Sequence, residues 1–216
     1  MKEEKFEKSE SGETEPRKVF PWETAWIKKP DANNPDDIDA YKRIEAQPTV
    51  QEWMDDAEEL STTEEVRELF TEKFFYGVCG EKSKGRMEGF VWLYKPEENT
   101  TTNINKSGLV DPKDAAILEI SFARYVDPDL PAESRERGLI PSAIRQICFP
   151  FVEKQEKTSI IAFTNPKNLL SEGVLKNAGF IIKGKIYYNE ESSEEDNFWV
   201  LDKNKLGTIL EKKKRY

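Results

Sequence analysis

Apolar residues recur along the chain at two different spacings, and these spacings predict where helices and strands lie. Helical spacing begins at Thr49, and a second helix follows that is capped at Thr62 or Thr63. We expect the stripe of the first helix to pack onto a sheet: Val50, Trp53, Met54, Ala57 and Leu60. Runs rich in aromatic and β-branched residues predict strands, the first two joined as a hairpin: 73–79, 87–95, 115–125, 159–164, 181–188 and 198–201. Two further helices are predicted, at 144–151 and 168–177.

Polar stretches separate these elements and set the expected domain boundaries. Residues 1–18 are dominated by charged and small residues, so we expect a disordered N-terminal tail. Residues 19–210 are predicted to form one domain, with an N-terminal helical part over 19–72, and residues 211–216 form a basic tail. Two polar stretches without periodicity predict surface loops: 31–39 and 96–113.

Composition removes several kinds of chemistry. The 216 residues contain no histidine, which excludes Ser-His-Asp and Cys-His triads and histidine-ligated metals. The two cysteines, Cys79 and Cys148, cannot form a disulfide framework or a four-cysteine metal site, and we expect both to be buried thiols. The net charge of −9 disfavours binding to nucleic acid, and no apolar run is long enough to span a bilayer. We therefore expect a cytoplasmic protein that needs no metal.

The most informative motif is NPKNLLSEGVLKNAGF at Asn165–Phe180, which follows a predicted strand. Its asparagine, serine and Gly-Phe spacing resembles the GNAT superfamily of acyl-CoA-dependent N-acyltransferases. In that family the strand before this helix splays from its neighbour, and the helix lies beside the pantetheine arm. The resemblance implies that Asn168 and Ser171 contact acetyl-CoA. The alternative is an ordinary amphipathic helix that is capped by a glycine, here Gly179.

A second motif resembles the pyrophosphate loop of the same family, (Arg/Gln)-x-x-Gly-x-(Gly/Ala) at the start of a helix. Here the sequence is RERGLI from Arg135, and the family's small residue is replaced by isoleucine. A register that starts at Arg137 is less favoured, because it would turn Arg145 and Gln146 toward the core. The resemblance implies cofactor contacts from the end of the preceding strand and from the loop: Tyr125, Val126, Arg135, Arg137, Gly138, Ile140 and Ser142. Extra residues at 130–134 lengthen this loop, and a solvated charged turn is the alternative.

Glu119 lies in the otherwise apolar strand sequence LEISF, where an acid is costly to bury unless it has a partner or a function. The resemblance implies that it is the general base, and burial would raise its pKa toward neutrality. A partly exposed strand carboxylate is the alternative. Leu175 stands where many family members have a tyrosine that protonates the thiolate. Water or another hydroxyl would then supply that proton: Ser171, Tyr187 or Tyr188.

Together these observations predict an α/β (α+β) fold with a mixed, mostly antiparallel central sheet and helices on both faces, most similar to the family over 73–201. The resemblance implies direct transfer of an acetyl group from acetyl-CoA to a primary amine within a ternary complex. The acceptor would be a protein N-terminus, a lysine or a small amine. The alternative is a non-catalytic GNAT-like module that binds CoA or a protein partner.

Overall fold

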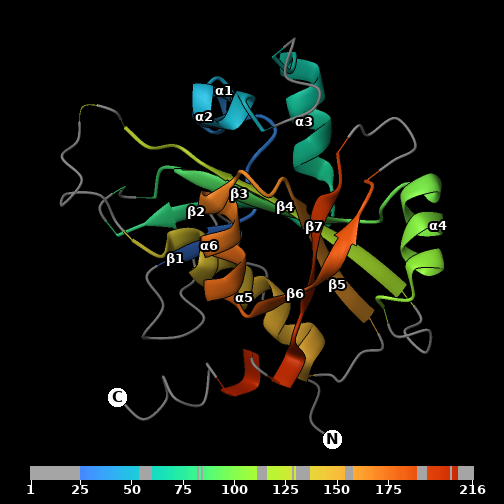
Figure 1. Cartoon of the computed structure of the whole chain (residues 1–216). Helices are drawn as coiled ribbons and strands as arrows, with labels where there is room; N and C mark the ends of the chain where they lie inside the picture. The colour runs from blue at the N-terminus through green and yellow to red at the C-terminus, as the bar shows by residue number, and fades with distance from the viewer. Residues whose placement is uncertain are drawn as a thin grey trace, which may run out of the picture.

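A seven-stranded sheet forms the centre of the computed structural model, in the order β1-β2-β3-β4-β5-β7-β6 (Figure 1). The structure describes residues 25–53, 60–81, 83, 85–110, 116–127, 129, 137–153, 158–188, 194–204 and 206–208. The predicted tails at 1–18 and 211–216 lie outside these residues. The strands are β1 Ala25–Lys28, β2 Phe75–Gly80, β3 Gly89–Tyr94, β4 Ala116–Arg124, β5 Thr158–Thr164, β6 Phe180–Ile186 and β7 Asp196–Leu201. The helices are α1 Pro35–Glu45, α2 Pro48–Gln51, α3 Thr63–Thr71, α4 Glu98–Ser107, α5 Leu139–Glu153 and α6 Leu169–Ala178.

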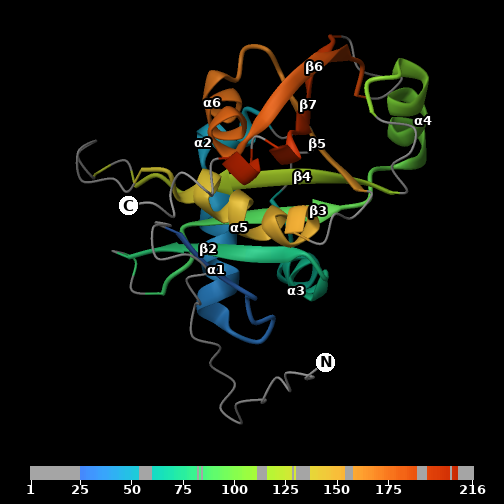
Figure 2. The same cartoon turned by 90° about the horizontal axis from the view of Figure 1, so that it is seen from below.

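All neighbouring strands are antiparallel except β4 and β5, which run parallel. This parallel pairing requires a crossover, and α5 provides it on one face of the sheet (Figure 2). The mixed, mostly antiparallel sheet and the hairpin of β2 and β3 confirm the fold predicted from the sequence.

Strand side chains alternate between two faces, and each face has its own helices. One face buries Val91, Ile120 and Ile160 against α5 and α6, in the largest core cluster. The opposite face carries two separate clusters. Phe75 and Phe90 pack with α1 and α3, whereas Ile161 packs with α4. Helices therefore cover both faces, and the α1/α3/α4 face has a seam between its two clusters.

The helix predicted from Thr49 is wrong in its start and its length. The element is the four-residue α2, which begins at Pro48, the residue whose fixed φ suits a first helical position. Its predicted stripe is not a core stripe where it is described, because Trp53 and Leu60 are exposed. The helix predicted after Thr62 is confirmed as α3, with a reciprocal capping box between Thr62 and Glu65.

Both predicted loops contain helices. Within 31–39, α1 begins at Pro35 after the Asn34 side chain accepts the N–H of Asp36. This Asn-Pro-Asp signal is a helix start that the turn-like composition concealed. Within 96–113, α4 forms from residues of low helix propensity, because Ile104 is completely buried against the sheet.

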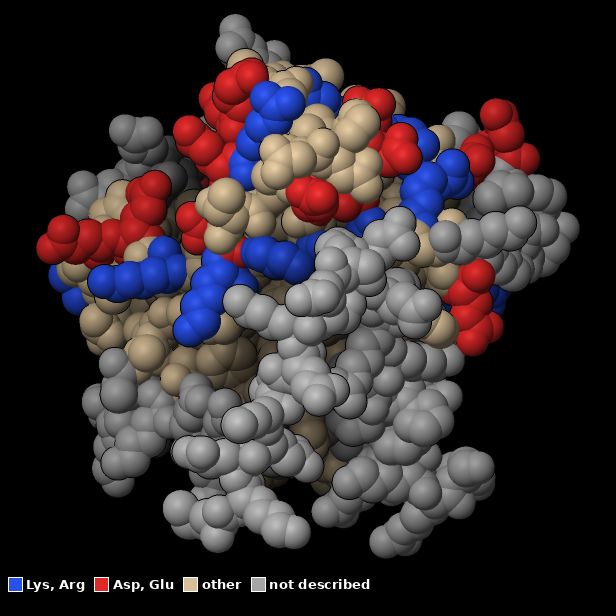
Figure 3. Space-filling view, turned by 180° about the vertical axis from the view of Figure 1, so that it is seen from behind, with Lys and Arg blue, Asp and Glu red and all other residues tan. Residues whose placement is uncertain are grey.

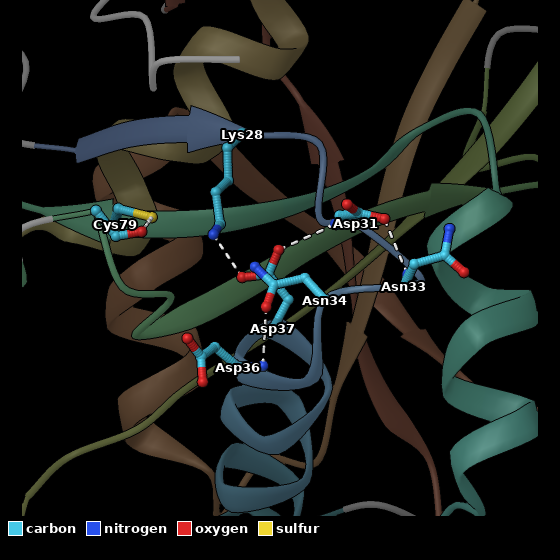
Figure 4. A network of polar contacts seen from close by, with 8 residues as sticks. Lys28, Asp31, Asn33, Asn34, Asp36, Asp37 and Cys79 are labelled. Carbon is cyan, nitrogen blue, oxygen red and sulfur yellow. Dashed lines mark hydrogen bonds and ion pairs between the residues drawn. The ribbon is translucent and has the colours of Figure 1, made fainter. Parts of the chain in front are cut away.

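A polar network fixes the connection from β1 to α1 (Figure 4). The Lys28 ammonium pairs with the buried Asp37 carboxylate, whose other oxygen accepts the N–H of Asp31 at 3.0 Å. Beside it, the Cys79 thiol donates to the Gly85 carbonyl at 3.3 Å. These contacts hold α1 against the sheet. Lys28, Asp37 and Cys79 therefore all have structural partners.

Candidate active site

Glu119 lies where β4 and β5 part. The parallel pairing runs through four registered pairs and ends at Glu119 and Ile161, although both strands continue beyond it. Beyond that point β5 stays paired with β7 on its other edge, whereas the β4 edge that follows Glu119 has no registered β5 partner. This divergence is the splay that the family resemblance implies.

The Glu119 carboxyl group is buried, with only 5% of the residue exposed. Its neighbours Tyr94 and Tyr188 donate hydrogen bonds to it. Burial, with a smaller contribution from the charge of Glu97, raises the pKa of Glu119 to about 7 despite these hydrogen bonds. The Oε2 atom has no hydrogen-bond partner within the described part of the chain. A buried, unpaired oxygen with a near-neutral pKa is suited to accept a proton.

Of the hydroxyls that the sequence offered in place of the missing tyrosine, only Tyr188 is in contact with Glu119. Tyr187 is half exposed, and Ser171 lies on the first turn of α6, where its N–H bonds to the Asn168 side chain at 3.1 Å. Leu175 is completely buried in the core. Tyr94 was not singled out from the sequence, although its place in an aromatic strand opposite Glu119 makes it the registered partner of the acid.

The predicted phosphate loop is described from Arg137 onward, so Arg135 lies outside the described residues. Arg137 is exposed, and Gly138 has a φ of +74°, in the region that favours glycine. α5 begins directly after it, and its first intrahelical bond runs from the Ser142 N–H to the Gly138 carbonyl. Leu139 and Ile140 lie in this first turn, whose N–H groups have no intrahelical acceptor, as an anion site requires, whereas Pro141 has no N–H.

The side chains of this first turn face the core. Ile140 packs over Gly89 of β3, where an added Cβ would lie 2.8 Å from the Ile140 Cδ1 atom. The Ser142 hydroxyl is completely buried and accepts the Ala25 N–H at 3.2 Å. Isoleucine in place of the family's small residue is therefore accommodated by a glycine on the neighbouring strand. The contribution of Ile140 to an anion site would come from its backbone.

The expectation that Arg145 and Gln146 avoid the core is wrong. Both are buried, and both donate to backbone carbonyls. Arg145 donates to the Asn177 carbonyl at 3.0 Å, near the C-terminus of α6, and Gln146 donates to the Ala25 carbonyl at 2.7 Å. The donor groups of both side chains bond to backbone carbonyls, although the Gln146 Oε1 atom has no partner within the described residues, so their burial does not discriminate between the two loop registers.

The strand end before the loop is held by residues that the sequence did not single out. The Gln47 amide bonds both backbone groups of Val126, accepting its N–H at 3.1 Å and donating to its carbonyl at 2.8 Å. The Tyr125 ring lies under the Arg43 guanidinium, 4.7 Å from its centroid. A glutamine that precedes a short helix gives no sequence signal for such a contact.

Asn168 caps α6, because its side-chain oxygen accepts the Ser171 N–H, and Gly179 ends the helix with a φ of +112°. The predicted helix is thereby confirmed, and Asn168 and Ser171 come together at its start, directly after β5. Cys79 and Cys148 are both buried free thiols, as predicted. Burial raises the pKa of Cys79 to about 11.

Neither metal nor membrane features accompany this site. Among the described residues, no group of three or more possible ligands could hold a metal ion. The helices in the described ranges are all too short or too polar to cross a membrane.

The sheet splays beside a buried acid, with a glycine-initiated helix on one side and an asparagine-capped helix on the other. This arrangement defines an acyltransferase-type α/β fold. The family described as "Acetyltransferase (GNAT) domain" matches residues 32–181, more than two thirds of the chain. The chain belongs to this GNAT acetyltransferase family. A search of curated proteins finds no match.

Solved structures share the fold at low identity. A GNAT-family acetyltransferase from Bacillus anthracis superposes with a TM-score of 0.58 at 15% identity, over 84% of this chain and 96% of that chain. The aminoglycoside acetyltransferase AAC(6')-Ib, in complex with paromomycin and acetyl-CoA, gives 0.57 at 14% identity, over 85% and 96%. The ribosomal-protein-S5-alanine acetyltransferase from Vibrio fischeri gives 0.56 at 15% identity, over 84% and 94%.

Proposed function

We propose that this protein is an N-acetyltransferase that moves an acetyl group from acetyl-CoA to a primary amine. The observation that carries the proposal is the buried Glu119 carboxyl, whose unpaired Oε2 lies where β4 and β5 part. A buried acceptor without a partner costs free energy in the absence of a ligand, so it favours an N–H donor beside it. The pKa of about 7 leaves half of the carboxyl ionised near neutral pH.

The residues of this chain fit acetyl-CoA in three places. The β4 edge beyond Glu119 can donate backbone hydrogen bonds, Gly138 and the first turn of α5 can hold the pyrophosphate, and Asn168 begins the helix beside the splay. When bound, the thioester supplies an activated acyl group. Backbone N–H donors in a buried site would polarise its carbonyl oxygen.

Proton movement is assigned to the Glu119 cluster. Glu119 accepts a proton from the acceptor ammonium and frees its nitrogen lone pair for attack on the acyl carbon. Tyr188 gives its hydroxyl proton to the departing CoA sulfur and regains one from Glu119 through their hydrogen bond. The ammonium nitrogen loses two protons on becoming an amide: one passes through Glu119 and Tyr188 to the thiol, and the other is released to water as the C–S bond breaks, so both side chains return to their starting states.

Release of the CoA thiol from acetyl-CoA in the presence of a panel of amines tests this function. The panel includes alkylamines, diamines, aminoglycosides and peptides with free N-termini. Wild type should turn over at least one amine, and Glu119→Gln should reduce kcat by about a hundredfold or more. The exposed Glu68→Gln on α3 is the charge-matched control and should leave kcat unchanged. CoA binding without turnover of any amine would instead identify a non-catalytic module.

A further inference from the structure

The Gln47 carboxamide pairs with the end of β4 as a neighbouring strand would. Its oxygen accepts the Val126 N–H at 3.1 Å, and its nitrogen donates to the Val126 carbonyl at 2.8 Å. The Tyr125 N–H, one residue earlier, donates to the Glu88 carbonyl beside β3 at 2.7 Å. Backbone groups of successive residues in an extended chain point to opposite sides, so those of Val126 point away from β3. Gln47 therefore occupies the edge of β4 that faces the divergence from β5.

This contact sets one end of the open β4 edge. The other end is Glu119, the last residue of β4 with a registered partner on β5. Residues 120–123 lie between these two points and have no registered β5 partner. The proposed function uses this stretch to bind acetyl-CoA through backbone hydrogen bonds. Gln47 thus bounds the stretch along which a ligand can pair with the strand.

The backbone of Gln47 is held on both sides, so its side chain starts from a fixed point. The Gln47 N–H donates to the Ile44 carbonyl at 3.2 Å, and the Gln47 carbonyl accepts the Val50 N–H at 2.8 Å. Ile44 is completely buried in the cluster that α1 forms with β2 and β3. A side chain that leaves a fixed backbone loses less entropy when it binds, and it holds its partner more rigidly. The end of β4 is therefore fixed relative to the core through α1.

A second residue of α1 holds the neighbouring position on the strand end. The Arg43 guanidinium lies over the Tyr125 ring, 4.7 Å from its centroid. Tyr125 directly precedes Val126, and Gln47 directly precedes α2. Two successive residues at the end of β4 are thus held by α1 and by the connection that follows it.

Long-range attraction does not replace this positioning for an anionic cofactor. The chain has a net charge of −9, and acidic and basic side chains are interspersed over the described part of the face seen in Figure 3. CoA carries phosphate groups, so a protein with this charge does not concentrate it at the surface. Its affinity then depends on backbone groups that are already in place before it binds.

We propose that Gln47 is a positioning residue for CoA, which bounds the open edge of β4 and holds its end in the conformation that the cofactor binds. Arg43 supports this role through the ring of Tyr125. The inference rests on the proposed function, since it names a residue that prepares the same site. It gives the connection between α1 and α2 a role in cofactor affinity rather than in proton transfer.

Calorimetric titration of the full chain with CoA tests this role without requiring turnover. Gln47→Met keeps the length of the side chain and removes both hydrogen bonds to Val126, so the Kd for CoA should rise about tenfold. Gln51→Met is the matched control, because the Gln51 amide donates to the Glu45 carbonyl at 3.0 Å, at the end of α1 rather than on β4. It should leave the Kd unchanged. An unchanged Kd in Gln47→Met, or an equal rise in Gln51→Met, would overturn the proposal.

A second variant keeps the test open if Gln47→Met does not fold. Gln47→Glu retains an oxygen for the Val126 N–H, but its ionised carboxylate cannot donate to the Val126 carbonyl. The Kd for CoA should therefore rise in this variant as well, and urea unfolding shows that the protein titrated is folded. Wild-type affinity in a folded Gln47→Glu protein would contradict the role of the paired hydrogen bonds.

Steady-state kinetics separate positioning of the cofactor from a general loss of structure. In Gln47→Met the KM for acetyl-CoA should rise about tenfold, whereas kcat at saturating acetyl-CoA should stay within about twofold of wild type, because Gln47 does not touch the reacting atoms. A fall in kcat with an unchanged KM would refute the role. If amines are acetylated and Gln47→Met has the wild-type KM and kcat, the enzyme stands and the role of Gln47 fails. If CoA binding depends on Gln47 but no amine is acetylated, the positioning role stands and the transferase fails.

Discussion

The buried carboxyl of Glu119 should make the folded protein less stable at neutral pH than a variant without the charge. In the unfolded chain this group has an ordinary pKa near 4.5, whereas burial raises it to about 7 in the fold. The folded state therefore holds the proton more tightly than the unfolded state. The free energy of unfolding is therefore highest below the unfolded-state pKa of 4.5. It falls as the pH rises from 4.5 to about 7 and is lowest above about pH 7.

The size of this effect follows from the shift in pKa. One pKa unit corresponds to about 1.36 kcal/mol, so the difference between a pKa of 4.5 and one of about 7 corresponds to about 3 kcal/mol. Glu119→Gln removes the ionisation and keeps the shape of the side chain. Its free energy of unfolding should exceed that of wild type by about 3 kcal/mol at about pH 8, which corresponds to a Tm higher by roughly 6–12 °C.

Urea unfolding at about pH 8 and about pH 4.5, with thermal melts at both, measures this difference. The advantage of Glu119→Gln should shrink to less than about 0.5 kcal/mol at the lower pH, because Glu119 is then mostly protonated in the fold. Glu68→Gln, an exposed change on α3, should show no pH-dependent gain. A Glu119→Gln variant that is no more stable than wild type at about pH 8, or equally stabilised at both pH values, would refute the reasoning.

Three further predictions concern the same region. The kcat/KM for amine acetylation should fall about tenfold for each pH unit below 7, with an apparent pKa of about 7 that a pH–rate profile measures; a flat profile would exclude Glu119 as the base. Tyr188→Phe should lower kcat about a hundredfold. It should also shift the apparent pKa of the pH–rate profile to a higher value, because a hydrogen bond to the Glu119 carboxylate is lost. Tyr187→Phe should change neither kcat nor this pKa. Gly89→Ala should lower the free energy of unfolding by about 2 kcal/mol in a urea melt, because its Cβ would lie 2.6 Å from the Ala123 carbonyl oxygen; wild-type stability would show that the strand relaxes.

Elements with strong local signals were predictable from the sequence. Strands β2 to β7 were found because aromatic and β-branched residues cluster in them, whereas the short β1 was not predicted. Helices α3 and α6 were found because Thr62 and Asn168 cap them visibly. α4 was missed because its Thr- and Asn-rich sequence disfavours a helix, and burial of Ile104 against distant strands decides its structure. α1 was missed for another reason, since the Asn-Pro-Asp start signal was present and was interpreted as a turn.

The sequence predicted part of the candidate site, as it predicted part of the fold. Glu119 stood out because a charge in an apolar strand demands an explanation, and the structure buries it as that argument required. Its partners are Tyr94 on β3 and Tyr188, which follows the end of β6, so only the tertiary fold brings them together. Gln47 on Val126 likewise depends on a contact between residues 79 positions apart, which spacing along the chain does not encode.

The four registered pairs between β4 and β5 have a consequence for local opening of the sheet. They are the only strand pairing between β1–β4 and β5–β7–β6 in the described sheet, and beyond them the two halves diverge. Alternate amides of residues 120–123 that point toward β5 therefore lack the ladder that protects amides elsewhere in the centre of the sheet. They should exchange with deuterated water faster than the amides of β3, and CoA that fills the divergence should slow them. Hydrogen exchange at β4 thus reports occupancy of the site independently of turnover.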